Sequence, residues 1–175
     1  MTSLASEIGY LLDYTEWDRA QWQAWFRSAG AEILLMDLGA NGDGRFGNVG
    51  QLVRHIFSAE QRYVDRIQDL PITDTSTVPA DDVDRLFDFG RQSRQRLRDL
   101  VDTFPAERWE LVREVEIASH MRRITPKTMI VQAVTHEIRH WAQLATLLRL
   151  AGRPTGIHDF LLSGVFERKL GRTSA

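Results

Sequence analysis

The sequence predicts an all-α protein, a four-helix bundle with a short β-hairpin before the last helix. Apolar residues recur every three or four positions over most of the chain, which is the period of an amphipathic helix. Capping and turn residues divide this pattern into four long segments. One stretch, residues 109–125, instead alternates apolar and charged residues as paired strands do. With 175 residues, 43% of them hydrophobic, residues 1–175 are expected to fold as a single domain.

The first helix is expected from residue 4 to about residue 26. Its apolar face consists of Leu4, Ile8, Leu11, Leu12, Trp22, Trp25 and Phe26. The letters SAG at 28–30 predict a break before AEILLMDL. The run GANGDGRFG at 39–47 predicts a loop, because its four glycines suit the backbone of turns.

The second helix is expected to begin after Asn48, which can cap it. Gln51 stands three residues later, where a capping box has a Glu or Gln whose side chain bonds the backbone N–H of the cap residue. The apolar face continues to about Gln68. The polar, proline-bounded run LPITDTSTVPADD then predicts a long crossover rather than a tight turn.

The third helix is the most charged of the four. Asp81 or Asp82 can cap it, and it is expected to end near residues 103–105. Its densest basic run is offset by nearby aspartates, so we interpret the run as a solvated helix face made of Arg91, Arg94 and Arg98.

The hairpin and the fourth helix follow. WELVREVEI is expected to form a strand and SHMRRIT its antiparallel partner. Thr125 and Pro126 then supply a cap and a favourable first helical residue, and the helical period continues to Gly152, a natural terminator. The remaining RPTGIHDFLLSGVFERKL is expected to make a turn and a short helix that packs back on the bundle.

Composition excludes several classes of function. The chain has no cysteine, so a metal can be held only by His, Asp or Glu, and any thiol must come from outside. The net charge of −2 offers no general attraction to nucleic acid or to an anionic membrane. No segment has the length and apolarity of a membrane span, and no basic flank with an apolar run opens the chain. We therefore expect a cytoplasmic protein.

The fourth helix carries the letters HEIRH, which fit the H-E-x-x-H pattern of zinc metalloproteases. His136 and His140 lie about 40° apart around a helix, one turn above the other, so both rings can approach one ion. A pair of packed histidines is the alternative. The long metzincin motif is excluded, because it needs glycine and histidine at the positions of Gln143 and Thr146. A protease ligand from a later helix would have to be Glu167, near the end of the chain.

A third ligand is needed to complete a site on the two histidines. His55 lies at the border of the apolar face of the second helix, where it could point between helices or simply be packed. His120 and His158 are placed in loops. Gln143 lies on the histidine stripe and could orient a ligand or a substrate.

Glu137 lies about 100° from His136, so it cannot easily bind the same ion. It could bond a metal-bound water, or pair with an arginine from another helix, which we favour. Glu60 is about 140° around its helix from His55 and is similarly not expected to be a ligand.

Two segments, NVGQLVRHIFSAEQRYVDRI and TPKTMIVQAVTHEIRHWAQLATLLRLAG, resemble the signature segments of the DinB superfamily, the DinB/YfiT-like metalloenzymes. The first has a leucine three residues before a histidine and a glutamate five after it. The second has two histidines four apart, then a glutamine and LLRLAG. The resemblance implies helices in up-down-down-up order, a homodimer, and a divalent metal held by His55, His136 and His140.

Three histidines suit zinc, nickel or iron and leave coordination positions open for chemistry. We therefore expect a metal-dependent enzyme acting on a small molecule in stress response or detoxification. Two reactions stay open, hydrolysis and thiol-dependent S-transfer, because characterised members of the superfamily include enzymes that use bacillithiol or mycothiol. The alternative is a non-catalytic bundle that binds a partner and retains the metal site. Arg139, Trp141 and Ala142 stand where many relatives have histidine, arginine and glycine, which leaves the substrate open.

Overall fold

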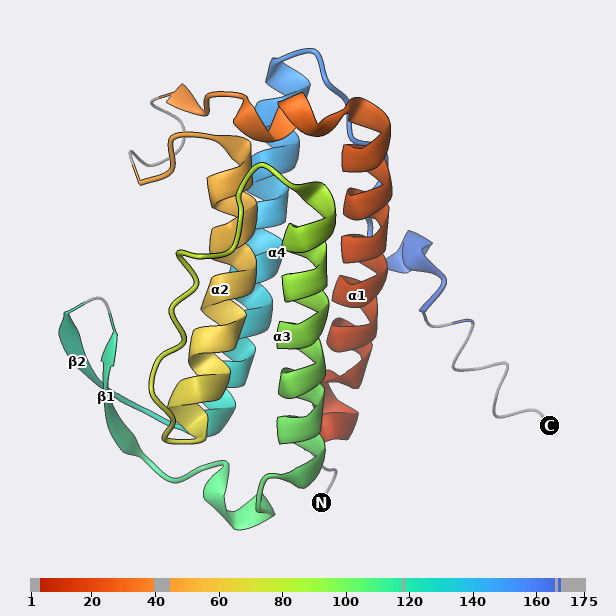
Figure 1. Cartoon of the computed structure of the whole chain (residues 1–175). Helices are drawn as coiled ribbons and strands as arrows, with labels where there is room; N and C mark the ends of the chain where they lie inside the picture. The colour runs from red at the N-terminus through yellow and green to blue at the C-terminus, as the bar shows by residue number, and fades with distance from the viewer. Residues whose placement is uncertain (1–3, 40–44, 118, 166, 168–175) are drawn as a thin grey trace.

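A computed structural model describes residues 4–39, 45–117, 119–165 and 167 (Figure 1). It confirms the all-α bundle and the hairpin. The four long helices are α1 (Leu4–Ala29), α2 (Val49–Ile67), α3 (Val83–Thr103) and α4 (Pro126–Leu150). In Figure 1, α1 and α4 run in one direction and α2 and α3 in the other, which is the up-down-down-up order. This order requires the crossover, residues 68–82, to run back along the bundle from the end of α2 to the start of α3.

Three of the helices begin where the predicted caps stand. The side chains of Asn48, Asp82 and Thr125 each accept a hydrogen bond from the backbone N–H three residues further on. Such bonds satisfy N–H groups that a helix leaves unpaired at its start. The prediction for Gln51 was wrong in one detail, because its Oε1 accepts from the N–H of Gly47, one residue before the cap.

The predicted breaks also occur. Gly30 has φ 94°, a conformation that L side chains rarely adopt, and a short 3₁₀ helix, η1 (Ala31–Leu35), follows it. The glycine-rich run lies partly outside the described residues. After α4, Gly152 with φ 74° ends the helix, and a further 3₁₀ turn, η4 (Leu161–Ser163), contacts α1.

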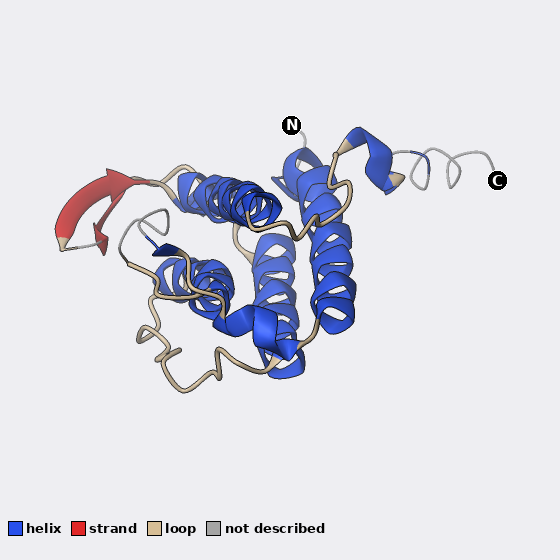
Figure 2. Ribbon diagram, turned by 90° about the horizontal axis from the view of Figure 1, so that it is seen from above, coloured by secondary structure: helices blue, strands red, loops and turns tan. Residues whose placement is uncertain are grey.

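The hairpin consists of β1 (Arg113–Ile117) and β2 (His120–Ile124), paired antiparallel with Arg113 opposite Ile124. A 3₁₀ turn, η3 (Ala106–Arg108), connects it to α3. Figure 2 shows both strands outside the four helices, at one edge of the bundle. Val115 and Ile124 pack against the bundle core. The hairpin therefore covers one end of the core. Contacts between the helices, and not the hairpin, position the site.

The bundle has two apolar cores with a polar layer between them. One core contains Trp22, Phe57 and Trp141, and the other contains Leu97 and Met129. On each helix, the residues of the two cores are separated in sequence by a buried charged residue, and these four are Arg19, Glu60, Arg94 and Glu137. Each helix thus contributes one of these four residues to the middle of the bundle.

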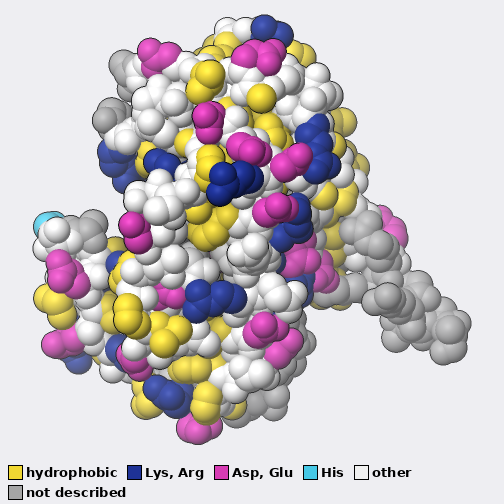
Figure 3. Space-filling model, in the orientation of Figure 1, with side chains coloured by type: hydrophobic (Ala, Val, Ile, Leu, Met, Phe, Trp, Pro, Cys, Tyr) yellow, Lys and Arg dark blue, Asp and Glu magenta, His cyan; other side chains and the backbone are white. Residues whose placement is uncertain are grey.

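The outer surface carries mixed charges. On the face drawn in Figure 3, basic and acidic side chains are interspersed and form no large patch of one sign. Within the described ranges, none of the helices has the length and apolar character that a membrane crossing requires.

The segment after α4 returns to α1 and is held there by His158. Its Nδ1 lies 2.5 Å from Asp18 Oδ1, and its Nε2 lies 2.9 Å from the carbonyl oxygen of Thr155. Its ring stacks on Trp22 at 4.5 Å between centroids. Both ring nitrogens face oxygens that accept, so the geometry favours the imidazolium form. Burial alone would lower the pKa of His158, but the hydrogen bond and charge of Asp18 outweigh it and raise the pKa above its ordinary value.

We therefore expect His158 to stabilise the fold most at mildly acidic pH. A group whose pKa is raised by folding stabilises fully below its unfolded pKa, about 6.5, and loses the effect as pH rises through the folded pKa. The unfolding free energy of the protein and of a His158→Gln variant, measured by urea denaturation from pH 6 to pH 9, should differ less at the alkaline end. A difference that grew with pH would contradict the imidazolium assignment. Asp18→Asn should lower the pKa of His158 in an NMR titration.

Candidate metal centre

Three histidines from two helices meet at one point. His55 comes from α2, and His136 and His140 come from successive turns of α4, which packs against α2. The Nε2 atom of His136 lies 3.1 Å from Nε2 of His55 and 3.1 Å from Nε2 of His140. One ring nitrogen from each of the three lies within 4.8 Å of the others. His55 and His136, which are 81 residues apart in sequence, are thus brought into contact.

The separations fit a small divalent cation. Bonds of about 2.1 Å from zinc to imidazole in tetrahedral geometry place ligand nitrogens about 3.4 Å apart. The 3.1 Å contacts are close to that value without rearrangement. Nitrogen lone pairs that converge repel one another unless a proton or a cation lies between them. The three residues could therefore hold a metal ion.

Gln143 fixes the tautomer of one histidine. Its Oε1 lies 2.9 Å from Nδ1 of His140, and an amide oxygen can only accept, so Nδ1 carries the hydrogen. In the neutral ring the Nε2 lone pair then points at the cluster, as in metal sites where an outer partner orients the ligand. Nδ1 of His136 is buried and has no such partner among the described residues. The polar contacts of His136 are therefore those of its Nε2 with the other two histidines.

Two of the three histidines, His55 and His136, are neutral at physiological pH. Burial, together with the neighbouring histidines and Arg45, lowers the pKa of His55 to about 3. Burial, then the charges of His140, Arg139 and Arg45, lowers the pKa of His136 to about 4. Both rings therefore keep a lone pair available. His140 is 1% exposed, whereas the other two are half-buried and His55 also lines a cleft, so the centre reaches solvent on the His55 side.

Phe46 covers part of that opening. Its ring centroid lies 4.6 Å from that of His55 and 6.3 Å from that of His140. It precedes α2 in the loop after η1, and no local sequence pattern indicated that it lines the centre. An aromatic ring at this position excludes water from one side of the imidazoles.

The two glutamates that follow the histidines face the other way, into the polar layer. Glu137 binds Arg19 Nε at 2.6 Å and Arg94 Nη2 at 2.7 Å, and Trp141 Nε1 donates to it at 3.2 Å. Glu60 binds the same two arginines. Two carboxylates and two guanidiniums, one from each helix, thus form a buried set with no net charge.

This set determines what Glu137 can do. Among the described residues, its hydrogen-bond partners are the two arginines and Trp141, and none of them is a histidine. The H-E-x-x-H protease mechanism needs this glutamate as a general base, which a carboxylate bound by two guanidiniums cannot supply. The arginine pairing that we favoured from the sequence is what the structure has. Burial would raise the pKa of Glu60, but Arg19, Arg94 and the hydroxyl of Ser93 lower it below the ordinary value.

One sequence interpretation is corrected here. Arg94 is not part of a solvated face, because it is 3% exposed and donates to Glu60, Glu137, Thr15 Oγ1 and the carbonyl oxygen of Leu12. The signal that could have located it was the pair of glutamates on otherwise apolar helix faces, since buried carboxylates require cations.

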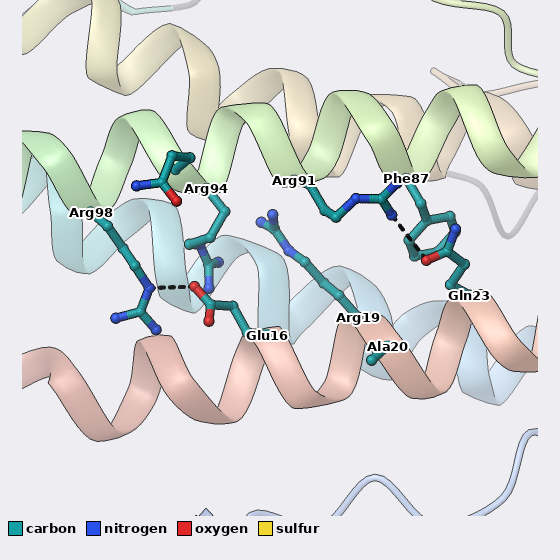
Figure 4. Close-up of a pocket in the computed structure, with 9 residues that line it drawn as sticks. Glu16, Arg19, Ala20, Gln23, Phe87, Arg91, Arg94 and Arg98 are labelled. Atoms are coloured by element: carbon teal, nitrogen blue, oxygen red, sulfur yellow. Dashed lines mark hydrogen bonds and ion pairs between the residues drawn. The ribbon is translucent and has the colours of Figure 1, made fainter.

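The neighbours of Arg94 line a pocket of about 390 Å³ between α1 and α3 (Figure 4). Arg98 binds Glu16 and Asp13, and Arg91 binds Asp88 and Gln23. Each of these arginines already has a carboxylate, so the pocket offers little attraction to an anion.

The remaining two histidines lie away from the three-histidine centre. His120 is exposed on β2, and His158 is bound to Asp18.

The fold and the centre together define a class of protein, a four-helix bundle with an up-down-down-up order and three histidines that could hold a metal. Comparison with protein-family models matches residues 1–167 to the DinB family. The chain belongs to that family. A search of curated proteins found no match.

Proposed function

We propose that this protein is a divalent-metal-dependent enzyme that catalyses hydrolysis or thiol-dependent S-transfer on a small molecule. The observation that carries the proposal is the convergence of the Nε2 atoms of His55, His136 and His140 with two 3.1 Å separations. A zinc, nickel or iron ion held there would supply Lewis acidity, which lowers the pKa of water or of a thiol toward neutrality. A thiol would be a separate low-molecular-weight cosubstrate, because the chain contains no cysteine.

The protein's own residues prepare the site in three ways. Gln143 holds the ring of His140 in the tautomer that directs its lone pair at the cluster. Phe46 excludes water from one side. Glu60 and Glu137, bound to both buried arginines, connect the helices that carry the histidines to α1 and α3. A site built this way is rigid on its inner side and open on the side of His55.

Turnover assays can separate the reactions. Purified protein, stripped with chelator and reloaded with zinc, nickel or iron, is tested against activated esters and electrophiles, with and without low-molecular-weight thiols. Turnover of esters without thiol identifies a hydrolase, and turnover of electrophiles only with thiol identifies an S-transferase. His55→Ala should abolish either activity, whereas His120→Ala should not. A protein that binds metal but turns over none of these compounds would instead be the non-catalytic bundle.

A further inference from the structure

A second cleft lies beside the metal centre and has a different chemical character. It has a volume of about 260 Å³ and is formed by one face of α2 and by the crossover. The residues that line it are Arg45, Phe46, Gln51, Arg54, His55, Ser58, Arg62, Asp74, Thr75 and Ser76. His55 and Phe46 therefore belong to both the cleft and the metal centre. A molecule in the cleft would have one end beside the three histidines.

Arginines dominate the charge of the cleft. Arg54 and Arg62 lie two turns apart on α2, and Arg45 precedes the helix, while Asp74 is the one carboxylate among the lining residues. The Asp74 oxygen accepts from the N–H of Ser76, which lowers the pKa of Asp74 and keeps it ionised. Counted over the lining residues alone, three guanidiniums against one carboxylate give a formal charge of about +2 at neutral pH.

The cleft also contains a buried hydroxyl that the fold does not use. Ser58 lies on α2 between Arg54 and Arg62, is 2% exposed, and its Oγ has no hydrogen-bond partner among the described residues. An unpaired buried hydroxyl costs about 1–3 kcal/mol, so a retained one calls for an explanation. It stands next to two guanidiniums in the same cleft.

The crossover wall is held firmly in place. Nη1 of Arg54 donates to the carbonyl oxygens of Ser76 and Val78, at 3.2 and 3.0 Å. Arg62 Nη2 reaches Thr75 Oγ1 at the longer distance of 3.4 Å. At the next contact along the crossover, a Cβ on Gly50 would lie 1.7 Å from the carbonyl oxygen of Ala80, so only glycine permits this approach. The cleft is therefore part of the folded structure.

We propose that this cleft binds an anionic oxygen group, a carboxylate or a phosphate, of the molecule whose reacting atom lies at the three-histidine centre. The identification of the bound molecule as substrate rests on the proposed function, but the binding of an oxyanion does not. Guanidiniums bind oxyanions through paired N–H donors, and the Ser58 hydroxyl, which has no partner among the described residues, supplies a further donor. The substrate or the cosubstrate is accordingly an acid.

The test is an NMR titration of metal-free protein with inorganic phosphate and, separately, with succinate at low salt. Amide signals of Ser58, Arg62 and Thr75 should shift saturably with at least one of the two anions, and the tighter one identifies the group. Arg62→Gln should weaken binding by about tenfold or more, because a hydrogen bond to a charged group is lost. Arg62→Lys should lose less, and Ser58→Ala should lose a few fold (about 2–5).

The matched control is Arg123→Gln, which removes the same charge from an exposed position on β2 and should leave binding unchanged. Unchanged affinity in Arg62→Gln, or the absence of saturable shifts at the cleft with both anions, would overturn the proposal. The metal content of the protein tests the three-histidine centre separately. If the protein fails to bind metal, the proposed function is wrong, but the anion titration still tests whether the cleft binds an oxyanion. If Arg62→Gln retains its metal but loses the anion, the two sites are distinct.

Discussion

Replacing His55 with alanine is expected to reduce bound metal from about one ion per chain to a trace, as completely as replacing His140. His136 and His140 would remain one turn apart on α4, but two imidazoles on one helix face make a weak site. Loss of a residue that hydrogen-bonds a metal ligand typically weakens metal affinity about 10- to 100-fold. Loss of a ligand itself should weaken the affinity more. The measurement is elemental mass spectrometry of each variant after chelator stripping and reloading with zinc.

Two further variants sharpen the result. Gln143→Leu should lower affinity by about 10- to 100-fold without abolishing binding, because it removes the acceptor that orients His140 and leaves all three ligands. His120→Ala, on the exposed face of the hairpin, should keep full metal content. Full occupancy in His55→Ala would show that the third ligand is another residue.

Replacing Arg94 with methionine is expected to destabilise the fold by about 3–5 kcal/mol, the usual result of removing one partner of a buried ion pair. The reason is that Glu60 and Glu137 would share the single remaining guanidinium of Arg19. Thr15 and the carbonyl oxygen of Leu12 would also lose a donor. Urea denaturation measures the change. Arg91→Met, on the same helix but more than half exposed, should change stability by less than about 1 kcal/mol.

Adding Glu137→Gln to Arg94→Met should recover part of the loss, because one carboxylate and one guanidinium would remain. A double-mutant cycle therefore predicts strong coupling between the two positions. Additive effects would mean that the charges act independently and would contradict a shared buried layer. If Arg94→Met proves too unstable to purify, Arg94→Lys keeps the charge with fewer donors and should show a smaller loss in the same direction.

Local features of the fold were predictable from the sequence because their interactions are local. The caps at Asn48, Asp82 and Thr125 each bond to a residue three positions away, so the letters alone contain both partners. The stacking of His136 over His140 follows from the helical repeat in the same way. The hairpin was predictable because the alternation of side chains on a strand has a period of two.

Features that depend on contacts between distant segments were not derivable from spacing. His55 was predicted as a metal ligand from the family resemblance alone. Only the packing of α2 on α4 brings it to His136. Arg94 looked like a surface residue because its own helix is highly charged, and its burial depends on two glutamates from other helices. Phe46 and the arginine cleft depend on where the loop and the crossover pack, which no local pattern encodes.

The central claim is that His55, His136 and His140 together hold one divalent ion. X-ray absorption of the zinc-loaded protein counts the ligands directly. The structure predicts three imidazole nitrogens at about 2.0–2.1 Å, with any remaining ligand a light oxygen or nitrogen atom. A spectrum with fewer than three imidazoles, or a chain that binds no zinc, would contradict it.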